Sequence, residues 1–90
     1  MTVKMKISPT LYHFAEGQNV VEVNGSTIGE CLKDLVAKFP DLEKNLLNQQ
    51  GVLHEYLEIY VNRVRVNPGS YDGYVKDGDE LYIIPVIDGG

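Results

Sequence analysis

The chain has 90 residues, of which 43% are hydrophobic and 23% are charged, and 13 acidic against 8 basic residues give a net charge of −5. This length allows one small domain with a single core, and this composition argues against a disordered chain or a coiled coil. No apolar run approaches the roughly 18–20 residues that span a bilayer, and an acidic chain is poorly suited to bind nucleic acid or anionic membranes. We therefore expect neither nucleic acid nor a membrane among its partners.

The first part of the chain predicts two antiparallel strands. Val3, Met5 and Ile7 alternate with polar residues, which is the pattern of a strand with one buried face. Pro9 disfavours continuation of that strand. A turn at residues 16–19 then leads into a second strand at residues 20–23, and we expect the two strands to pair as a hairpin.

The clearest helix in the sequence is predicted between Thr27 and Pro40. Thr27 and Glu30 match the S/T-x-x-E pattern of a capping box, and Pro40 disfavours helical geometry in the residue before it. The apolar residues between these limits recur at helical spacing and form one stripe that can cover a sheet face. They are Ile28, Cys31, Leu32, Leu35, Val36 and Phe39.

Asp34 and Lys38 lie one helical turn apart on the polar side of this helix, so we expect them to form an ion pair. Residues 41–56 are polar and weakly periodic, and predict only a short helical turn. The remainder of the chain alternates again and predicts three strands separated by turns, at residues 57–61, 64–66 and 81–85.

The predicted order is strand, strand, helix, strand, short strand and strand. The last strand is the most apolar, which favours a central position in the sheet, parallel to the first strand. The order therefore predicts an α+β fold, with a mixed sheet and one main helix packed on one face. This is the β-grasp or ubiquitin-like architecture. We expect residues 1–85 to form the domain and residues 86–90 to form a flexible tail.

The sequence lacks the local motifs of common enzymes and metal sites, including phosphate loops, HExxH and GxSxG. Asp77 and Asp79 do not have the spacing of a calcium loop, so we interpret them as parts of a solvated turn. Cys31, His13 and His54 are too far apart in sequence to indicate a metal site. We interpret Cys31 as a core residue rather than a reactive thiolate, and a single cysteine favours a cytoplasmic location.

Tyr60, Tyr82 and Ile84 are predicted on the sheet face that points away from the helix, because successive side chains of a strand alternate between faces. Exposed tyrosine and isoleucine side chains in one place can form a docking patch for a partner. The other interpretation is a sheet face that is merely covered by amphipathic rings. The sequence leaves both interpretations open.

Beyond Pro85 the sequence runs to Ile87, Asp88, Gly89 and Gly90. Glycine has no Cβ, so a Gly-Gly end can enter a narrow slot and bring its carboxylate close to a reactive group. This arrangement suits delivery of a carboxylate into the active site of another protein. The alternative is a frayed terminus or a remnant of cloning. The predicted β-grasp order and the apolar last strand favour the functional interpretation.

Together these features resemble the ubiquitin-like sulfur carriers of the ThiS/MoaD family. The resemblance covers the whole domain and rests on residues 77–81 (DGDEL), residues 83–85 (IIP) and the terminal Gly89-Gly90. Residues 54–62 and the tail look most like the carriers that supply sulfur for cysteine-type biosynthesis. Carriers for molybdopterin and thiazole synthesis share the Gly-Gly end.

The resemblance implies a function for the tail. A partner enzyme of the ubiquitin-activating type adenylates the carboxylate of Gly90 with ATP, a sulfur donor converts it to a thiocarboxylate, and a second biosynthetic enzyme accepts the sulfur. ATP and the sulfur donor are used by the partner, so this chain binds no cofactor stably and is not an enzyme. Two other functions stay open, a protein modifier joined through Gly90 and a plain ubiquitin-like binding module.

Overall fold

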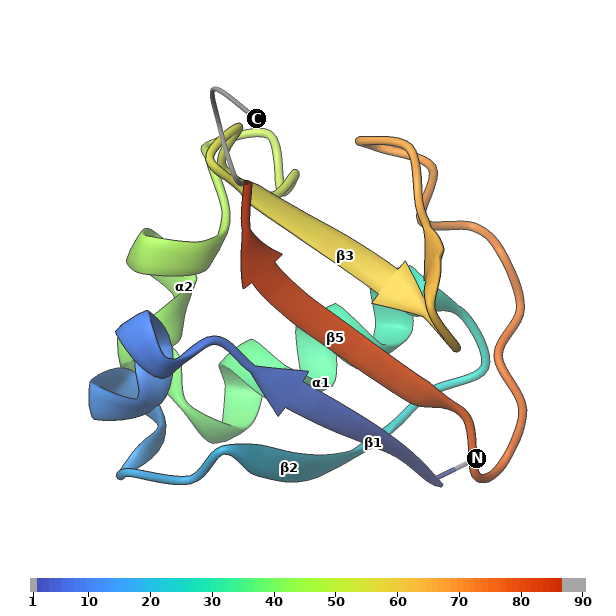
Figure 1. Cartoon of the computed structure of the whole chain (residues 1–90), viewed down its shortest axis with the longest axis horizontal. Coiled ribbons are helices and arrows are strands. Elements are labelled where there is room, and N and C mark those ends of the chain that lie inside the picture. The colour runs from blue at the N-terminus through green and yellow to red at the C-terminus, as the bar shows by residue number, and fades with distance from the viewer. Residues whose placement is uncertain (1, 87–90) are drawn as a thin grey trace.

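The computed structural model describes residues 2–86, and the expectations for Ile87, Asp88, Gly89 and Gly90 lie outside the described residues. The elements follow in the order β1 (Thr2–Ile7), η1 (Pro9–Ala15), β2 (Val20–Asn24), α1 (Ile28–Lys38), α2 (Pro40–Leu46), β3 (Leu57–Val61), β4 (Val64–Arg65) and β5 (Glu80–Pro85). Figure 1 shows α1 lying across one face of the sheet.

The five strands form one mixed sheet in the order β2-β1-β5-β3-β4. Strand β1 is antiparallel to β2 and parallel to β5, and β5 is antiparallel to β3. The last strand therefore lies in the centre of the sheet, parallel to the first, as predicted (Figure 1). This position explains why β5 is the most apolar strand, because a central strand has neighbours on both edges and α1 covers one of its faces. The β-grasp prediction is confirmed.

Side chains of α1 and of the inner sheet face form the core. The predicted apolar positions of the helix are buried, except that Val36 is partly exposed. Cys31 is fully buried at 0% exposure, which confirms its interpretation as a core residue, and burial raises the pKa of its thiol. The strand residues in this core are Val3, Met5, Ile7, Val21, Val23, Leu57, Ile59, Leu81 and Ile83.

Two connections differ from the simple sequence prediction. Strands β1 and β2 pair as predicted, but the 3₁₀ helix η1 lies between them, so their connection is not a tight turn. Leu11 and Ala15 of η1 are buried, which explains why this segment folds against the domain. Pro40 follows the end of α1 as predicted, and it also begins α2 at a position where a missing N–H group costs nothing.

The beginning of α1 is capped by side chains and by a distant loop. The Thr27 hydroxyl accepts the Glu30 N–H at 3.1 Å as predicted, whereas the Glu30 carboxylate accepts the N–H of Ser26 rather than that of Thr27. The carbonyl groups of Tyr71 and Gly73 accept N–H groups of the first helical turn. The loop before β5 is thereby tied to α1, and the free N–H groups at the start of the helix are satisfied.

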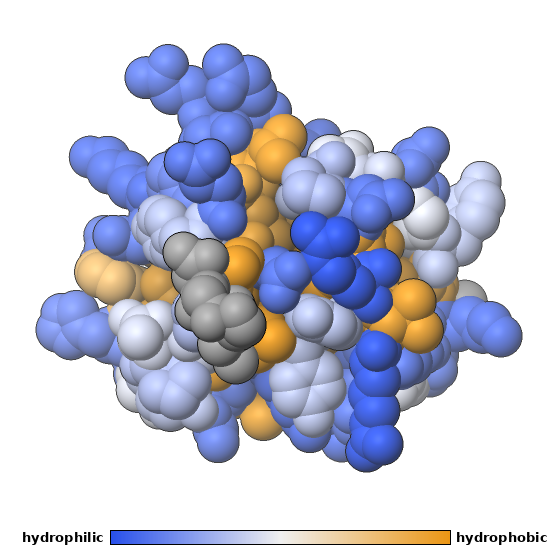
Figure 2. All heavy atoms as spheres, turned by 45° about the horizontal axis from the view of Figure 1, so that its top comes forward, coloured by the Kyte–Doolittle hydropathy of each residue, from blue (hydrophilic) through white to orange (hydrophobic). Residues whose placement is uncertain are grey.

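Polar residues cover most of the surface seen in Figure 2, and hydrophobic residues show through between them in a stripe that runs down from the top. A hollow of about 430 Å³ lies in this region, beside the end of β5. Leu53, Leu57, Ile59, Val66 and Val86 contribute to its lining. The N-terminal half of β3 is therefore less closely covered than the centre of the sheet.

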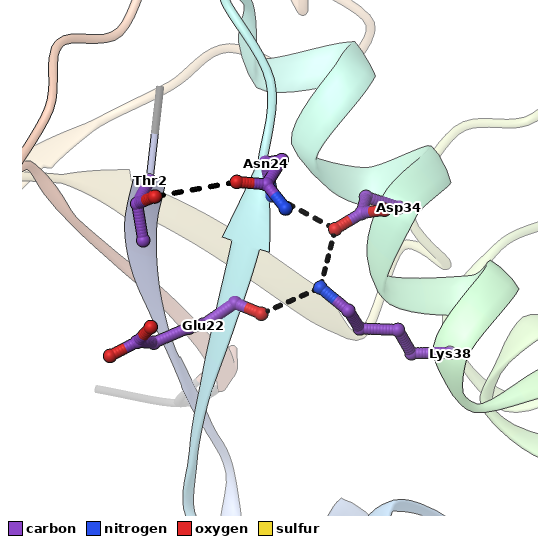
Figure 3. A network of polar contacts seen from close by, with 5 residues as sticks. All are labelled: Thr2, Glu22, Asn24, Asp34 and Lys38. Carbon is purple, nitrogen blue, oxygen red and sulfur yellow. Dashed lines mark hydrogen bonds and ion pairs between the residues drawn. The ribbon is translucent and has the colours of Figure 1, made fainter.

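The predicted ion pair of Asp34 with Lys38 forms at 2.8 Å and extends to strand β2. The Asp34 carboxylate also accepts the backbone N–H of Asn24 at 2.8 Å, and the Lys38 ammonium group donates to the Glu22 carbonyl at 2.9 Å (Figure 3). These contacts fasten the edge strand β2 to α1. The hydrogen bond from Lys38, followed by that from Asn24, holds the pKa of Asp34 below its usual value.

Replacing Asp34 with asparagine (Asp34→Asn) is expected to lower the free energy of unfolding at pH 7 by about 1 kcal/mol, because the ion pair is lost. The pKa of Asp34 is lower in the folded than in the unfolded chain, so its contribution is complete above about pH 4 and disappears as the pH falls through the lowered pKa. Urea unfolding across this range should show a smaller loss of stability on acidification in the variant. Asp72→Asn, in an exposed loop, is the matched control. If the free energy of unfolding falls with decreasing pH equally in Asp34→Asn and in the wild type, the prediction is wrong.

Candidate functional site

The sheet face that α1 leaves uncovered carries a row of side chains across all five strands. Val20, Lys6, Tyr82, Tyr60 and Arg65 are paired in succession from β2 to β4. Directly paired residues share a face of the sheet, so these side chains form one continuous line. The structure thus places the two tyrosines side by side on the open face, and their role in docking stays a prediction.

Ile84 lies two residues beyond Tyr82 on β5 and shares its face. These two residues line a shallow hollow of about 240 Å³ together with Tyr60 and Arg63. The structure therefore brings together the three residues that the sequence predicted for docking. It adds Arg63, which the sequence analysis missed. The only signal for Arg63 was its place in a turn, and a turn does not show toward which face its side chain lies.

The polar groups of the open face are mostly paired with one another. The Lys6 ammonium group donates to the Tyr82 hydroxyl at 2.7 Å and lies 3.7 Å from the Glu80 carboxylate. The hydrogen bond to Tyr82 is the main cause that raises the pKa of Lys6; desolvation opposes it, and the charge of Glu80 adds a smaller effect in the raising direction. Arg65 forms an ion pair with Glu58 on the neighbouring strand. These contacts hold the tyrosine rings in a defined arrangement.

The described chain ends where the central strand leaves the sheet. Strand β5 ends at Pro85, and the N–H of Val86 donates to the Tyr56 carbonyl at 2.8 Å. Val86 also lines the larger hollow beside β3. The segment that precedes Ile87 is therefore held by backbone hydrogen bonds up to the last described residue. Any group carried by residues 87–90 starts from a fixed point of the domain.

The carboxylates of the turn before β5 have structural contacts. Asp77 accepts the backbone N–H of Thr2 at 2.9 Å, and Asp79 accepts the backbone N–H of Lys76 at 2.8 Å. The bond from Lys76, followed by a side-chain bond from Asn62, lowers the pKa of Asp79. Within residues 2–86, no three His, Cys, Asp or Glu side chains lie together as a metal site.

The two histidines also take part in local packing. The Nε2 atom of His54 lies 2.8 Å from the Lys44 carbonyl oxygen, and its ring stacks on Tyr56 at 5.2 Å between centroids. The ring of His13 meets Phe14 edge-on at 5.3 Å. No helix in the described part of the chain is long and apolar enough to cross a membrane.

The fold and the open face define a ubiquitin-like protein with one covered and one exposed sheet face. Residues 5–90 match the ThiS family, and the chain belongs to this family. Small archaeal modifier protein 1 of Haloferax volcanii is 31% identical over 71 residues, which cover 78% of each chain.

Solved structures agree with this assignment. The chain superposes on the structure of the BexX/CysO complex of Amycolatopsis orientalis with a TM-score of 0.85 and 31% identity, covering 98% of this chain and 99% of that one. CysO of Mycobacterium tuberculosis gives a TM-score of 0.84 and 31% identity over 94% and 99% of the two chains. The protein is thus a ubiquitin-like carrier or modifier and not an enzyme.

Replacing Tyr82 with phenylalanine (Tyr82→Phe) is expected to lower the pKa of Lys6 toward its ordinary value of 10.5, because the hydroxyl that accepts from the ammonium group is lost. The measurement is a pH titration of lysine side-chain signals by NMR. Tyr60→Phe, which removes a hydroxyl that bonds to Glu58 instead, is the control and should leave the pKa of Lys6 unchanged. An unchanged Lys6 titration in Tyr82→Phe would show that the bond does not persist in solution.

Proposed function

We propose that the chain is a sulfur carrier whose C-terminal carboxylate, at Gly90, is activated by a partner enzyme and converted to a thiocarboxylate. The observation that carries this proposal is the match to the ThiS family over residues 5–90, which includes Gly89 and Gly90. The sulfur is then donated to a second enzyme in cofactor or sulfur amino-acid biosynthesis. The stretch at residues 54–62 favours a cysteine-type pathway over molybdopterin or thiazole synthesis.

The chemistry requires activation because a carboxylate is a poor electrophile. The partner, an adenylating enzyme of the ubiquitin-activating type, joins the Gly90 carboxylate to AMP and releases pyrophosphate from ATP. Sulfide then attacks the carbonyl carbon, the new C–S bond forms, and the C–O bond to AMP breaks. Glycine suits this step because it has no Cβ to obstruct the approach of the attacking group. ATP and the sulfur donor are bound by the partner, which fits a cytoplasmic carrier.

The fold supports this role by holding the root of the tail. Strand β5 is paired on both edges, and Val86 is bonded to Tyr56. The four residues after Val86 can extend at most roughly 14 Å, which sets how deeply Gly90 can enter a partner. The activating enzyme docks on the open face around Tyr60, Tyr82 and Ile84, so that docking and tail insertion occur together.

A second function is favoured by the 31% identity to small archaeal modifier protein 1. In that case a lysine amine of a target protein attacks the activated Gly90 in place of sulfide, and an amide bond forms. The two functions share the same activated carboxylate and differ only in the attacking atom. The third possibility, a binding module that acts through its sheet face alone, requires no activation of Gly90.

The test of the sulfur-carrier proposal is the intact mass of the chain after incubation with the activating enzyme, ATP and sulfide. The expected product has one oxygen replaced by one sulfur at Gly90. A variant without Gly89-Gly90 is the control and should stay unchanged. If the wild-type chain also stays unchanged while the enzyme activates another carrier under the same conditions, the proposal is wrong.

The same variant separates the other two functions. A modifier predicts a ladder of high-mass conjugates in cell extract that disappears when Gly89-Gly90 is removed. A binding module predicts that this deletion leaves partner binding unchanged, whereas Tyr82→Ala weakens it.

A further inference from the structure

Arg63 adds a positive charge beside the shallow hollow of the open face, and this charge has no ion-pair partner in the described residues. The outward positions of the five strands hold three acidic and three basic side chains, and two ion pairs join four of these six across strands. These six residues are Glu22, Glu58, Glu80, Lys4, Lys6 and Arg65. Lys4 and Glu22 lie opposite each other in the register of β1 and β2 without an ion pair. The Arg63 guanidinium group also has neither an ion pair nor a hydrogen bond with any residue of the described chain, and, unlike Lys4, Arg63 lines the shallow hollow.

The backbone at Arg63 is held in a conformation that favours glycine. Asn62 and Arg63 form the two-residue turn between β3 and β4, with φ angles of 47° and 74°. Such turns usually place glycine at one of these positions, because a Cβ is unfavourable at positive φ. Asn62 stabilises the turn through side-chain bonds to Asp79 and to the backbone N–H of Glu80, both at 3.0 Å. Arg63 thus occupies a position where a residue with a Cβ is unfavourable.

The surroundings of Arg63 are apolar. Its side chain lines the shallow hollow of about 240 Å³ with Tyr60, Tyr82 and Ile84. When a partner covers this hollow, water is excluded and an ion pair at its rim becomes stronger than on an open surface. The guanidinium group presents several donors in one plane, which match the two oxygens of a carboxylate.

We infer that Arg63 selects the partner. In this docking, the activating enzyme inserts one of its apolar side chains into the hollow. A neighbouring Asp or Glu of the enzyme then pairs with the guanidinium group of Arg63. This inference rests on the proposed function and specifies the partner of the same site. The chain has a net charge of −5, so an acidic partner surface is attracted to the unpaired positive charge beside the hollow and repelled by the excess of acidic groups on the chain as a whole. The partner's carboxylate therefore also fixes the orientation of docking.

The test is the carrier-dependent exchange of pyrophosphate into ATP by the activating enzyme. The charge-reversal variant Arg63→Glu should raise the carrier concentration for half-maximal exchange by about tenfold or more, since an unpaired carboxylate now faces another. The maximal rate should be unchanged, because the tail is intact. The carrier concentration for half-maximal exchange with Arg63→Lys should lie between those of Arg63→Glu and the wild type. Added salt should reduce the difference in this concentration between Arg63→Glu and the wild type.

Lys33→Glu is the matched control, because it makes the same charge change on α1 without altering the open face. The carrier concentration for half-maximal exchange with Lys33→Glu should stay within about twofold of the wild-type value, as expected for a charge outside the interface. Thermal unfolding of each variant verifies that it is folded. A charge-reversing substitution of an acidic residue on the enzyme that restores docking of Arg63→Glu identifies the paired carboxylate.

The outcomes separate the two proposals. If Arg63→Glu and Lys33→Glu behave alike while the wild-type chain supports exchange, the role of Arg63 is overturned and the carrier function stands. If a proven active enzyme gives no exchange with the wild-type chain, the carrier function fails, and the assignment of Arg63 to that enzyme fails with it.

Discussion

The parallel pairing of β1 with β5 is the contact on which the rest of the structure depends. It joins the two ends of the domain through register pairs that run from Lys4 and Glu80 to Ile7 and Ile83. Parallel strands require a crossover connection, and α1 is part of the segment that crosses the sheet here. The helix therefore covers one face and leaves the other open. The same pairing holds β5 between two neighbours, which fixes the point where the tail begins.

In the function proposed here, the open face and the root of the tail act together as one docking surface. Tyr60 and Tyr82 lie on β3 and β5, and β5 ends at Pro85, immediately before the last described residue, Val86. In this proposal the chain needs no catalytic group of its own, because the partner would supply the chemistry. We propose that Arg63 adds selectivity through one charge in an apolar setting. The acidic groups elsewhere contribute to capping and to fastening strands, as Asp34 and Asp79 do.

Much of the fold could be predicted because its signals are local. Helical spacing and a capping box defined α1, and alternation placed Tyr60 and Tyr82 on the same face. The segment η1 was missed because burial of Leu11 and Ala15 against the domain, rather than periodicity, determines its structure. The link from Asp34 to strand β2 and the side-chain position of Arg63 depend on contacts between distant segments. Sequence spacing carries no information about such contacts.

The most direct test of the combined surface is an NMR titration of the labelled chain with the activating enzyme. The account predicts that signals of the outward residues of β1, β3 and β5, including Lys6, Tyr60, Tyr82 and Ile84, change or broaden first. Signals of exposed residues on α1, such as Lys33, should change little. Perturbations confined to α1, with the open sheet face unaffected, would contradict the account.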